Sequence, residues 1–338
     1  MVNKWVGKKG IPDTMGELFK LLKRGNRSAM LAAIVNTIIA IIKAAAYVIT
    51  GNVAMFAETM HSLGDAANQF FVFVGSALSK KAPTEKFPNG FGRLVNLVLL
   101  GAVLIVGIMA FETIREGYHH VIHPTESSGF WINILVLAVA TLLETFVLFK
   151  AMKEVLHDNE VEAGGLGVFF KSFSYLGRAK PATKLVFLED TVATLGGLLA
   201  IIAVVAARFT DFHQLEGIAS ILIGGMMFFV VGKVFLDNAA GVIGQADEEM
   251  ENKIGELVMA DPDVKDIQDI TVIKEGEDLH VELEIEIDPN LTVAAADDIK
   301  DRLEEKILSE NGVVDVTIEI DEEDGVMTWK NQKEPVSD

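Results

Sequence analysis

Six apolar stretches, each long enough to cross a bilayer, set the strongest limit on how this chain can fold. A helix needs about 20 residues to cross the hydrocarbon core. The stretches are Ser28–Thr50, Val53–Ser79, Leu94–Thr113, Gly129–Phe149, Ala182–Ala207 and Leu215–Phe235. The mean hydropathy of +0.36 over 338 residues also favours a membrane protein over two or three soluble domains.

The distribution of Lys and Arg predicts the orientation of these stretches. Basic residues precede the first stretch and fill the links between the second and third and between the fourth and fifth, whereas the opposite links carry only Arg115 and Arg208. Because basic loops stay on the cytoplasmic side, both termini are expected there. The N-terminal segment has no signal-peptide or transit-peptide pattern, which favours a prokaryotic plasma membrane.

The C-terminal part of the chain differs in charge and in periodicity. Residues 245–338 hold 30 acidic and 8 basic side chains, a net charge of −22, so binding to nucleic acid is not expected. The pattern predicts a helix over Asp247–Met259, strands over Val264–Lys274 and Asp278–Asp288, a helix over Val293–Leu308 capped by Thr292, and a strand over Val313–Ile320.

The predicted fold class is therefore an α-helical membrane protein. Six transmembrane helices are followed by a small α+β (αββαβ) cytoplasmic domain. The expected divisions are a cytoplasmic lead-in over residues 1–27, a six-helix transmembrane domain over 28–240, the αββαβ domain over 241–322, and a disordered tail over 323–338.

The second stretch carries charged side chains where a membrane helix ordinarily has none. In VAMFAETMHSLGDAANQF, the side chains of Glu58, His61, Asp65 and Asn68 are three or four residues apart, so they share one helix face. The fifth stretch adds the adjacent pair Glu189 and Asp190. Ionisable groups within a bilayer face protein or water and mark ion or proton pathways.

Two interpretations of the acidic residues stay open. The chain has no cysteine, so a metal site must use imidazole and oxygen ligands, which suit Zn, Mn, Fe or Co. The alternative is a purely structural role, in which a carboxylate forms an ion pair with Lys43 or Lys233. That alternative applies most to Glu58 and to Glu144 of the fourth stretch. For Asn68, a hydrogen bond between helices is favoured over a role as a ligand.

These residues resemble the cation diffusion facilitator family, the divalent-metal/proton antiporters that include zinc transporters. The resemblance covers nearly all of the chain after residue 28, with TGNVAMFAETMHSLGDAANQ and KKAPTEKFPNGFGR its most specific parts. Six spans and an αββαβ cytoplasmic domain match that family's architecture. The segment VFLEDTVATLGGLLA is similar to the branch that contains the mitochondrial zinc exporter. The resemblance also implies a homodimer joined partly by the cytoplasmic domain.

The resemblance implies a tetrahedral transport site between the second and fifth spans. Its ligands correspond to His61, Asp65 and Asp190, whereas the fourth position falls on Val186, which cannot coordinate a metal. Glu189 is the first substitute, and Glu58, Glu144 or water are the others.

The sequence thus predicts a transporter, not an enzyme, that exports a divalent metal in exchange for protons. Zinc is the first candidate substrate, with manganese, iron or cobalt as alternatives, and no prosthetic group is expected. A passive cation channel and a non-transporting metal sensor or scaffold of the same fold are the rival functions. An enzyme is disfavoured because no nucleophile–base set or phosphate-binding loop is evident.

Overall fold

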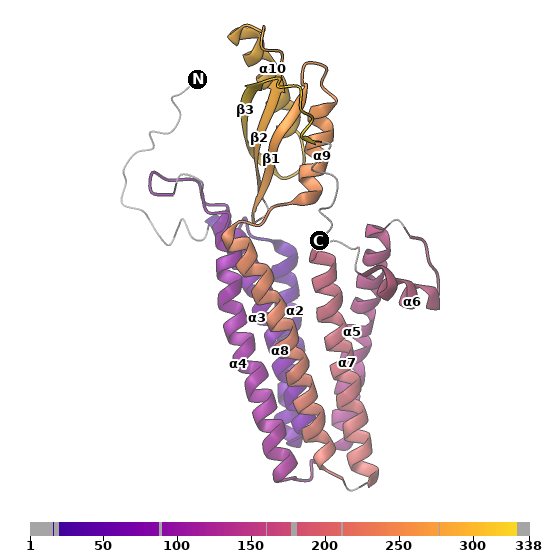
Figure 1. Ribbon diagram of the computed structural model, residues 1–338. Coiled ribbons are helices and arrows are strands. Elements are labelled where there is room, and N and C mark those ends of the chain that lie inside the picture. Colours follow the sequence, from indigo (N-terminus) through magenta and orange to yellow (C-terminus); the bar gives the residue numbers. More distant parts are fainter. Residues whose placement is uncertain are drawn as a thin grey trace. The chain divides into compact units, whose positions relative to one another are not determined.

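The structure is a computed structural model that describes residues 16, 20–87, 90–159, 161–176, 181–210, 212–276 and 278–329. It divides into two compact units, which we describe separately (Figure 1). The first comprises residues 1–77 and 98–237, and the second comprises residues 78–97 and 238–338. Most of the predicted lead-in over 1–27 lies outside the described residues.

Six long helices run through the first unit. They are α2 (Arg27–Thr50), α3 (Val53–Ser79), α4 (Leu94–Ile122), α5 (Phe130–Asp158), α7 (Pro181–Thr210) and α8 (Gln214–Ile243). Within the described residues, five of them are long and apolar enough to cross a membrane. The sixth is α3, which spans 27 residues and carries Glu58, His61 and Asp65. With the C-terminal domain described below, these helices confirm the predicted fold class.

Several helices extend beyond the apolar stretches that predicted them. Three of the predicted apolar stretches end at Thr113, Phe149 and Phe235. The corresponding helices α4, α5 and α8 continue to Ile122, Asp158 and Ile243. Hydropathy detects the part of a helix that lies in hydrocarbon, but the backbone hydrogen bonds of the helix continue into the polar region. A short helix, α6 (Leu166–Tyr175), lies between α5 and α7 and was not predicted.

The outer surface of the helical unit is apolar. Large side chains such as Val48, Trp131 and Phe209 are 78–79% exposed. In water such a surface would associate, whereas lipid tails solvate it. The interior instead uses small residues, including the fully buried Ala54, Ala57 and Ala110, which let helix backbones approach closely.

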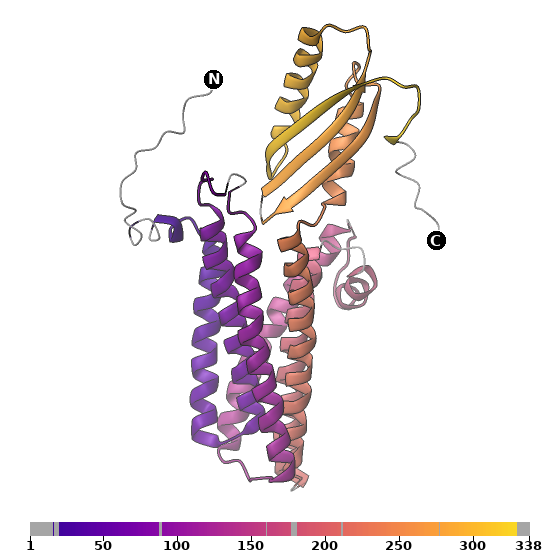
Figure 2. The ribbon, with the colours of Figure 1, turned by 60° about the vertical axis from the view of Figure 1, so that its left-hand side comes forward.

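The second unit contains the predicted αββαβ domain, seen in Figure 2. Strands β1 (Asp266–Glu275) and β2 (Asp278–Ile287) are antiparallel, and β3 (Val313–Glu322) pairs parallel to β2, so β2 is central. Helices α9 (Glu248–Met259) and α10 (Val293–Leu308) cover one face of the sheet. Thr292 caps α10 as predicted, accepting a hydrogen bond from the backbone N–H of Ala295.

The hydrophobic core of this domain lies between the two helices and the sheet. Alternate residues of β2, Leu279, Val281, Leu283 and Ile285, are buried, as the alternation in the sequence requires for a sheet with one covered face. At the end of α9, Asp261 accepts hydrogen bonds from Arg302 and Lys306 of α10. The bonds from Arg302 first, and then from Lys306, hold the pKa of Asp261 at about 2.

The expectation of a disordered tail from residue 323 is wrong for residues 323–329. Trp329 is only 8% exposed and belongs to the domain core. Its backbone N–H donates to Asp266 Oδ1 at 3.3 Å, and that of Thr328 donates to the same carboxylate. The composition of this segment is polar apart from a few residues, so it gave no sign that Trp329 is buried. Burial of this one large apolar side chain offsets the conformational entropy lost when the short segment becomes ordered. Residues 330–338 lie outside the described residues.

We expect Trp329→Ala to destabilise the C-terminal domain by about 3–5 kcal/mol, because it removes a buried aromatic side chain and leaves a cavity. Hydrogen exchange of the full-length protein should show faster exchange across α9 and β1. Val326→Ala is the control, since Val326 is 57% exposed. Equal exchange in the two variants would contradict the role of Trp329 as an anchor.

Candidate metal site

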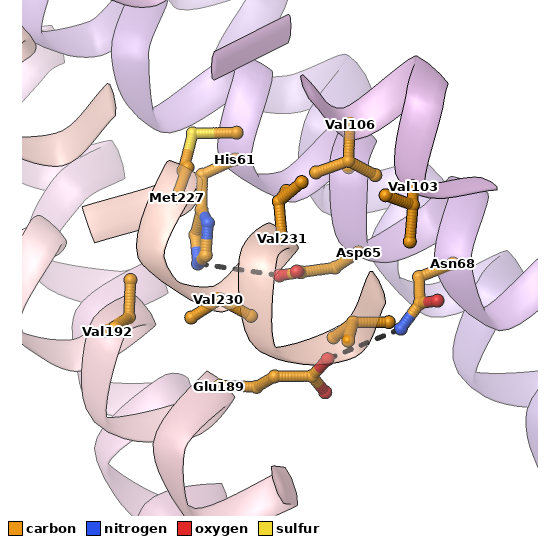
Figure 3. Close-up of a pocket in the computed structure, with 12 residues that line it drawn as sticks. His61, Asp65, Asn68, Val103, Val106, Glu189, Val192, Met227, Val230 and Val231 are labelled. Atoms are coloured by element: carbon orange, nitrogen blue, oxygen red, sulfur yellow. Dashed lines mark hydrogen bonds and ion pairs between the residues drawn. The ribbon is translucent and has the colours of Figure 1, made fainter. Parts of the chain in front are cut away.

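A small pocket of about 40 Å³ lies among helices α3, α4, α7 and α8 (Figure 3). One water molecule needs roughly 10–15 Å³ of cavity volume measured in the same way. The volume of the pocket is therefore enough for an ion with one or two waters. Its polar lining consists of His61, Asp65, Asn68 and Glu189. Its other walls are apolar, chiefly Val103, Val106, Val192, Met227, Val230, Val231 and Val234.

Helix α3 supplies the imidazole and one carboxylate. His61 Nε2 lies 3.6 Å from Asp65 Oδ2, as their spacing of four residues predicts. The side chain of His61 is 8% exposed and that of Asp65 is 38% exposed. His61 Nε2 has no hydrogen-bond partner within the described residues. A buried ring nitrogen and a more accessible carboxylate thus face one small polar space.

Helix α7 supplies the opposing carboxylate. Glu189 lines the same pocket, and its Oε1 accepts a hydrogen bond of 3.4 Å from Asn68 Nδ2 (Figure 3). Asn68 therefore makes an interhelical hydrogen bond, the role that the sequence favoured for it. The pocket brings together His61, Asp65 and Glu189 from two helices that are far apart in the chain.

Asp190 is not among the residues that line this pocket. Its Oδ2 is buried and has no hydrogen-bond partner in the described part of the chain. The charges that act on it most are those of Asp65, Glu144 and His61. Since adjacent helical residues point about 100° apart, Glu189 and Asp190 face two neighbouring polar regions.

The four predicted ligands do not form one closed coordination shell. Within the described residues, no three His, Asp or Glu side chains are arranged closely enough to hold one metal ion. Val186, at the position where the family resemblance implied a fourth ligand, is 47% exposed and does not line the pocket. Glu189, one turn of α7 further along, does line the pocket.

Glu58 and Glu144 occupy a separate buried ion-pair network. Lys43 Nζ of α2 lies 2.7 Å from Glu58 Oε2 and 3.0 Å from Glu144 Oε1. The side chains of Lys43 and Glu58 are fully buried, and that of Glu144 is 16% exposed. Both carboxylates thus make the pairing with Lys43 that the sequence offered as their structural role. One ammonium group joins α2, α3 and α5.

Two adjacent glycines of α7 leave room for this network. A Cβ at Gly196 would lie 2.8 Å from Glu58 Oε1. A Cβ at Gly197 would lie 2.2 Å from Thr141 Oγ1 and 3.3 Å from Glu144 Oε2. The distances from Gly196 to Glu58 Oε1 and from Gly197 to Thr141 Oγ1 are both shorter than a real Cβ makes, so a side chain at either position would force its neighbour to move.

An apolar cluster closes the bundle on one side of the pocket. It includes Ala54, Met55, Ala57, Ala110, Leu137, Ala200, Val204 and Ile223. His61 follows Ala57 of this cluster by one turn of α3, and Met227 belongs to the cluster and also lines the pocket. The apolar cluster therefore packs directly against the pocket.

The valine wall of the pocket was not predicted from the sequence. Valines occur throughout the apolar stretches, so nothing in the local pattern marks those that face the pocket. The spacing of the charged residues shows which face of α3 is polar. It does not show which residues of α4, α7 and α8 pack against that face, because this depends on the tertiary structure.

Comparison with known proteins places this arrangement in a family. Residues 29–241 match the cation efflux transmembrane domain, and residues 246–323 match the cation efflux protein cytoplasmic domain. The chain belongs to the cation efflux family, the cation diffusion facilitators, whose members are transporters.

Three relatives illustrate the range of the family. The mouse protein named proton-coupled zinc antiporter SLC30A9, mitochondrial, is 26% identical over 74% of this chain and 43% of its own length. Cation-efflux pump FieF of Cronobacter sakazakii is 24% identical over 88% of this chain and 92% of its own. Metal tolerance protein C4 of Arabidopsis thaliana is 25% identical over 64% and 46%. The chain thus spans less than half the length of the SLC30A9 relatives.

Removal of the buried ammonium should destabilise the helical unit. We expect Lys43→Met to cost about 3–5 kcal/mol, because it leaves two carboxylates buried without their cation. The triple variant Lys43→Met/Glu58→Gln/Glu144→Gln should recover most of this loss. The loss of stability and its recovery are both measured by thermal unfolding in detergent, with size-exclusion chromatography to monitor the folded protein that remains.

Lys233→Met is the matched control, because Lys233 lies in a membrane helix but is exposed. If Lys43→Met unfolded at the same temperature as Lys233→Met, the network would have no structural role.

Proposed function

We propose that this protein exports a divalent transition-metal ion from the cytoplasm in exchange for protons. The observation that carries the proposal is the pocket in which the His61–Asp65 pair of α3 faces Glu189 of α7. Zinc is the first candidate substrate, supported by the named activity of the SLC30A9 relatives. Manganese, iron and cobalt remain the alternatives, since one imidazole with carboxylates also suits them.

The charge of the site favours a cation. Asp65 repels the carboxylates of both Glu189 and Asp190. Within a membrane, such a cluster of like charges is costly unless a cation or protons neutralise it. A divalent ion bound between α3 and α7 would offset two of these charges at once. Asp190 would join such a site if α7 rotated by about half of the 100° between neighbouring helical residues.

Competition between metal and protons provides the coupling. Metal binding needs a neutral imidazole and ionised carboxylates, so each proton bound at the site opposes the metal. Imidazole is the side chain whose charge ordinarily changes nearest to neutral pH, which suits His61 to this exchange. Protons entering from the far side would release the metal, and the protonated site would return.

The apolar cluster accounts for alternation in this proposal. Transport requires that the pocket open to one side while the other is closed, and the apolar cluster packed against the pocket would form the closed side. We place both termini and the αββαβ domain in the cytoplasm, where the acidic surface of that domain would attract cations. We also propose that two copies form a homodimer, as the cytoplasmic-domain family suggests.

Reconstituted protein tests this function. In liposomes with an imposed pH gradient, uptake of Zn, Mn, Fe and Co should be driven by the gradient for one or more metals. His61→Ala, Asp65→Ala and Asp190→Ala should each abolish it while the protein stays folded. Normal transport by all three variants would exclude the site. Uptake without proton movement would indicate a channel, and no uptake by folded wild-type protein would indicate a sensor or scaffold.

Glu189→Gln tests the replacement of the missing fourth ligand. The amide keeps the shape of the side chain and an oxygen for Asn68, but it removes the charge. We expect metal affinity, measured by isothermal titration calorimetry, to fall about tenfold or more, equivalent to ~1.4 kcal/mol. Glu112→Gln is the control, since Glu112 pairs with Arg115 outside the pocket. Equal affinity in both variants would exclude Glu189 as a ligand.

A further inference from the structure

Helix α6 lies between α5 and α7 in the chain (Figure 1). It exposes an aromatic cluster that does not line the candidate metal site. Phe169, Phe170 and Phe173 are 47%, 66% and 45% exposed. Their rings contact one another, with centroid distances of 5.5 Å for Phe169–Phe170 and 5.1 Å for Phe169–Phe173. An exposed apolar patch of this kind ordinarily marks a surface that meets a partner or a membrane.

The opposite side of α6 is packed against the bundle. Val168 is 1% exposed and lies in a cluster with Leu148, Met152 and Val155 of α5 and Phe187 of α7. Lys171 is exposed, and its Nζ donates to the backbone oxygen of Glu162 at 3.1 Å. On a helix, Lys171 points about 100° from Phe170 and about 160° from Phe173. The helix therefore has a packed side, an aromatic side and a basic edge.

The residues of α5 near α6 indicate at which depth in the membrane α6 lies. Lys150 Nζ lies 4.8 Å from the ring centroid of Phe146, and Lys153 Nζ lies 4.9 Å from that of Phe149. Aromatic rings with lysines that extend past them are typical of the boundary between hydrocarbon and headgroups. Because α6 packs on Leu148, Met152 and Val155, it lies at this same level.

We infer that α6 is an interfacial membrane helix, with its aromatic side inserted at the boundary between acyl chains and headgroups and Lys171 directed toward the headgroups. The exposed aromatic surface continues the lipid-facing surface of α5, where Phe146 and Phe149 are also exposed. A membrane interface provides both of the environments that this surface needs, an apolar one for the rings and an anionic one for the ammonium. The inference depends on the membrane-spanning helices and not on the proposed transport activity.

The bilayer would then help to position the candidate metal site. The rings of Phe173 and Phe187 are 5.0 Å apart and nearly perpendicular, at 81°. Phe187 is fully buried and precedes Glu189 by two residues in α7. Helix α6 thereby connects the membrane interface to the turn of α7 that carries Glu189 and Asp190.

The absence of cysteine from the chain allows a direct test of the inserted side. A nitroxide label is placed on the full-length protein by Phe170→Cys, and separately by the neighbouring Lys171→Cys. Power-saturation EPR in liposomes of phosphatidylcholine and phosphatidylglycerol compares collision with oxygen and with a water-soluble nickel chelate. Ile202→Cys, at a site 62% exposed on α7, is the lipid reference, and Glu305→Cys, exposed on α10, is the water reference.

We expect the label at residue 170 to favour oxygen, as at 202, and the label at 171 to favour the nickel chelate, as at 305. A nickel preference at both positions would overturn the inference by placing the aromatic side in water. Protection of residue 170 from both reagents would also overturn it, because a protein surface, such as a second copy, would then cover the patch. Size-exclusion chromatography of the labelled variants in detergent micelles confirms that each is folded and monodisperse.

Discussion

The ion pairs of Lys43 with Glu58 and Glu144 are the interaction on which the helical unit most depends. They join α2, α3 and α5 through a side chain with no exposure to solvent. Buried charges are tolerated only when they are paired, so the three helices cannot separate without a large cost. The network fixes the face of α3 that turns inward. His61 lies one turn from Glu58 on that face, so the same constraint directs it into the bundle.

Two polar regions therefore exist side by side within an apolar bundle, and they differ in how they are neutralised. Glu58 and Glu144 have a permanent cation in Lys43. Asp65 and Glu189 have none within the described residues beyond the nearby imidazole of His61. A site that binds and releases a cation needs carboxylates without a permanent cationic partner. A structural ion pair, in contrast, needs carboxylates that a fixed cation such as Lys43 already neutralises. This difference separates the candidate ligands from the carboxylates that hold the helices together.

Much of this arrangement was predictable from the sequence, and the exceptions have physical causes. Period and hydropathy predicted the six long helices and the αββαβ domain, because those signals follow the backbone geometry directly. They missed α6, because its ten residues are few for a helical period and lie in a link between two apolar stretches. They also missed the burial of Trp329, because a single anchor in a polar tail has no pattern. The pairing of Lys43 was only one of two alternatives, since the choice depends on which helices are neighbours.

The adjacent carboxylates of α7 connect these two regions. Glu189 lines the pocket with His61 and Asp65, while Asp190 is subject to the charges of Glu144 as well as those of the pocket. A rotation of α7 by about half of the 100° between neighbouring residues would turn both carboxylates equally toward α3. Gly196 and Gly197, on the same helix, remove the side chains that would otherwise obstruct its movement past Glu58 and Thr141. In the proposed transport cycle, one helix would therefore supply both candidate carboxylate ligands and, through Gly196 and Gly197, a surface free of obstructing side chains.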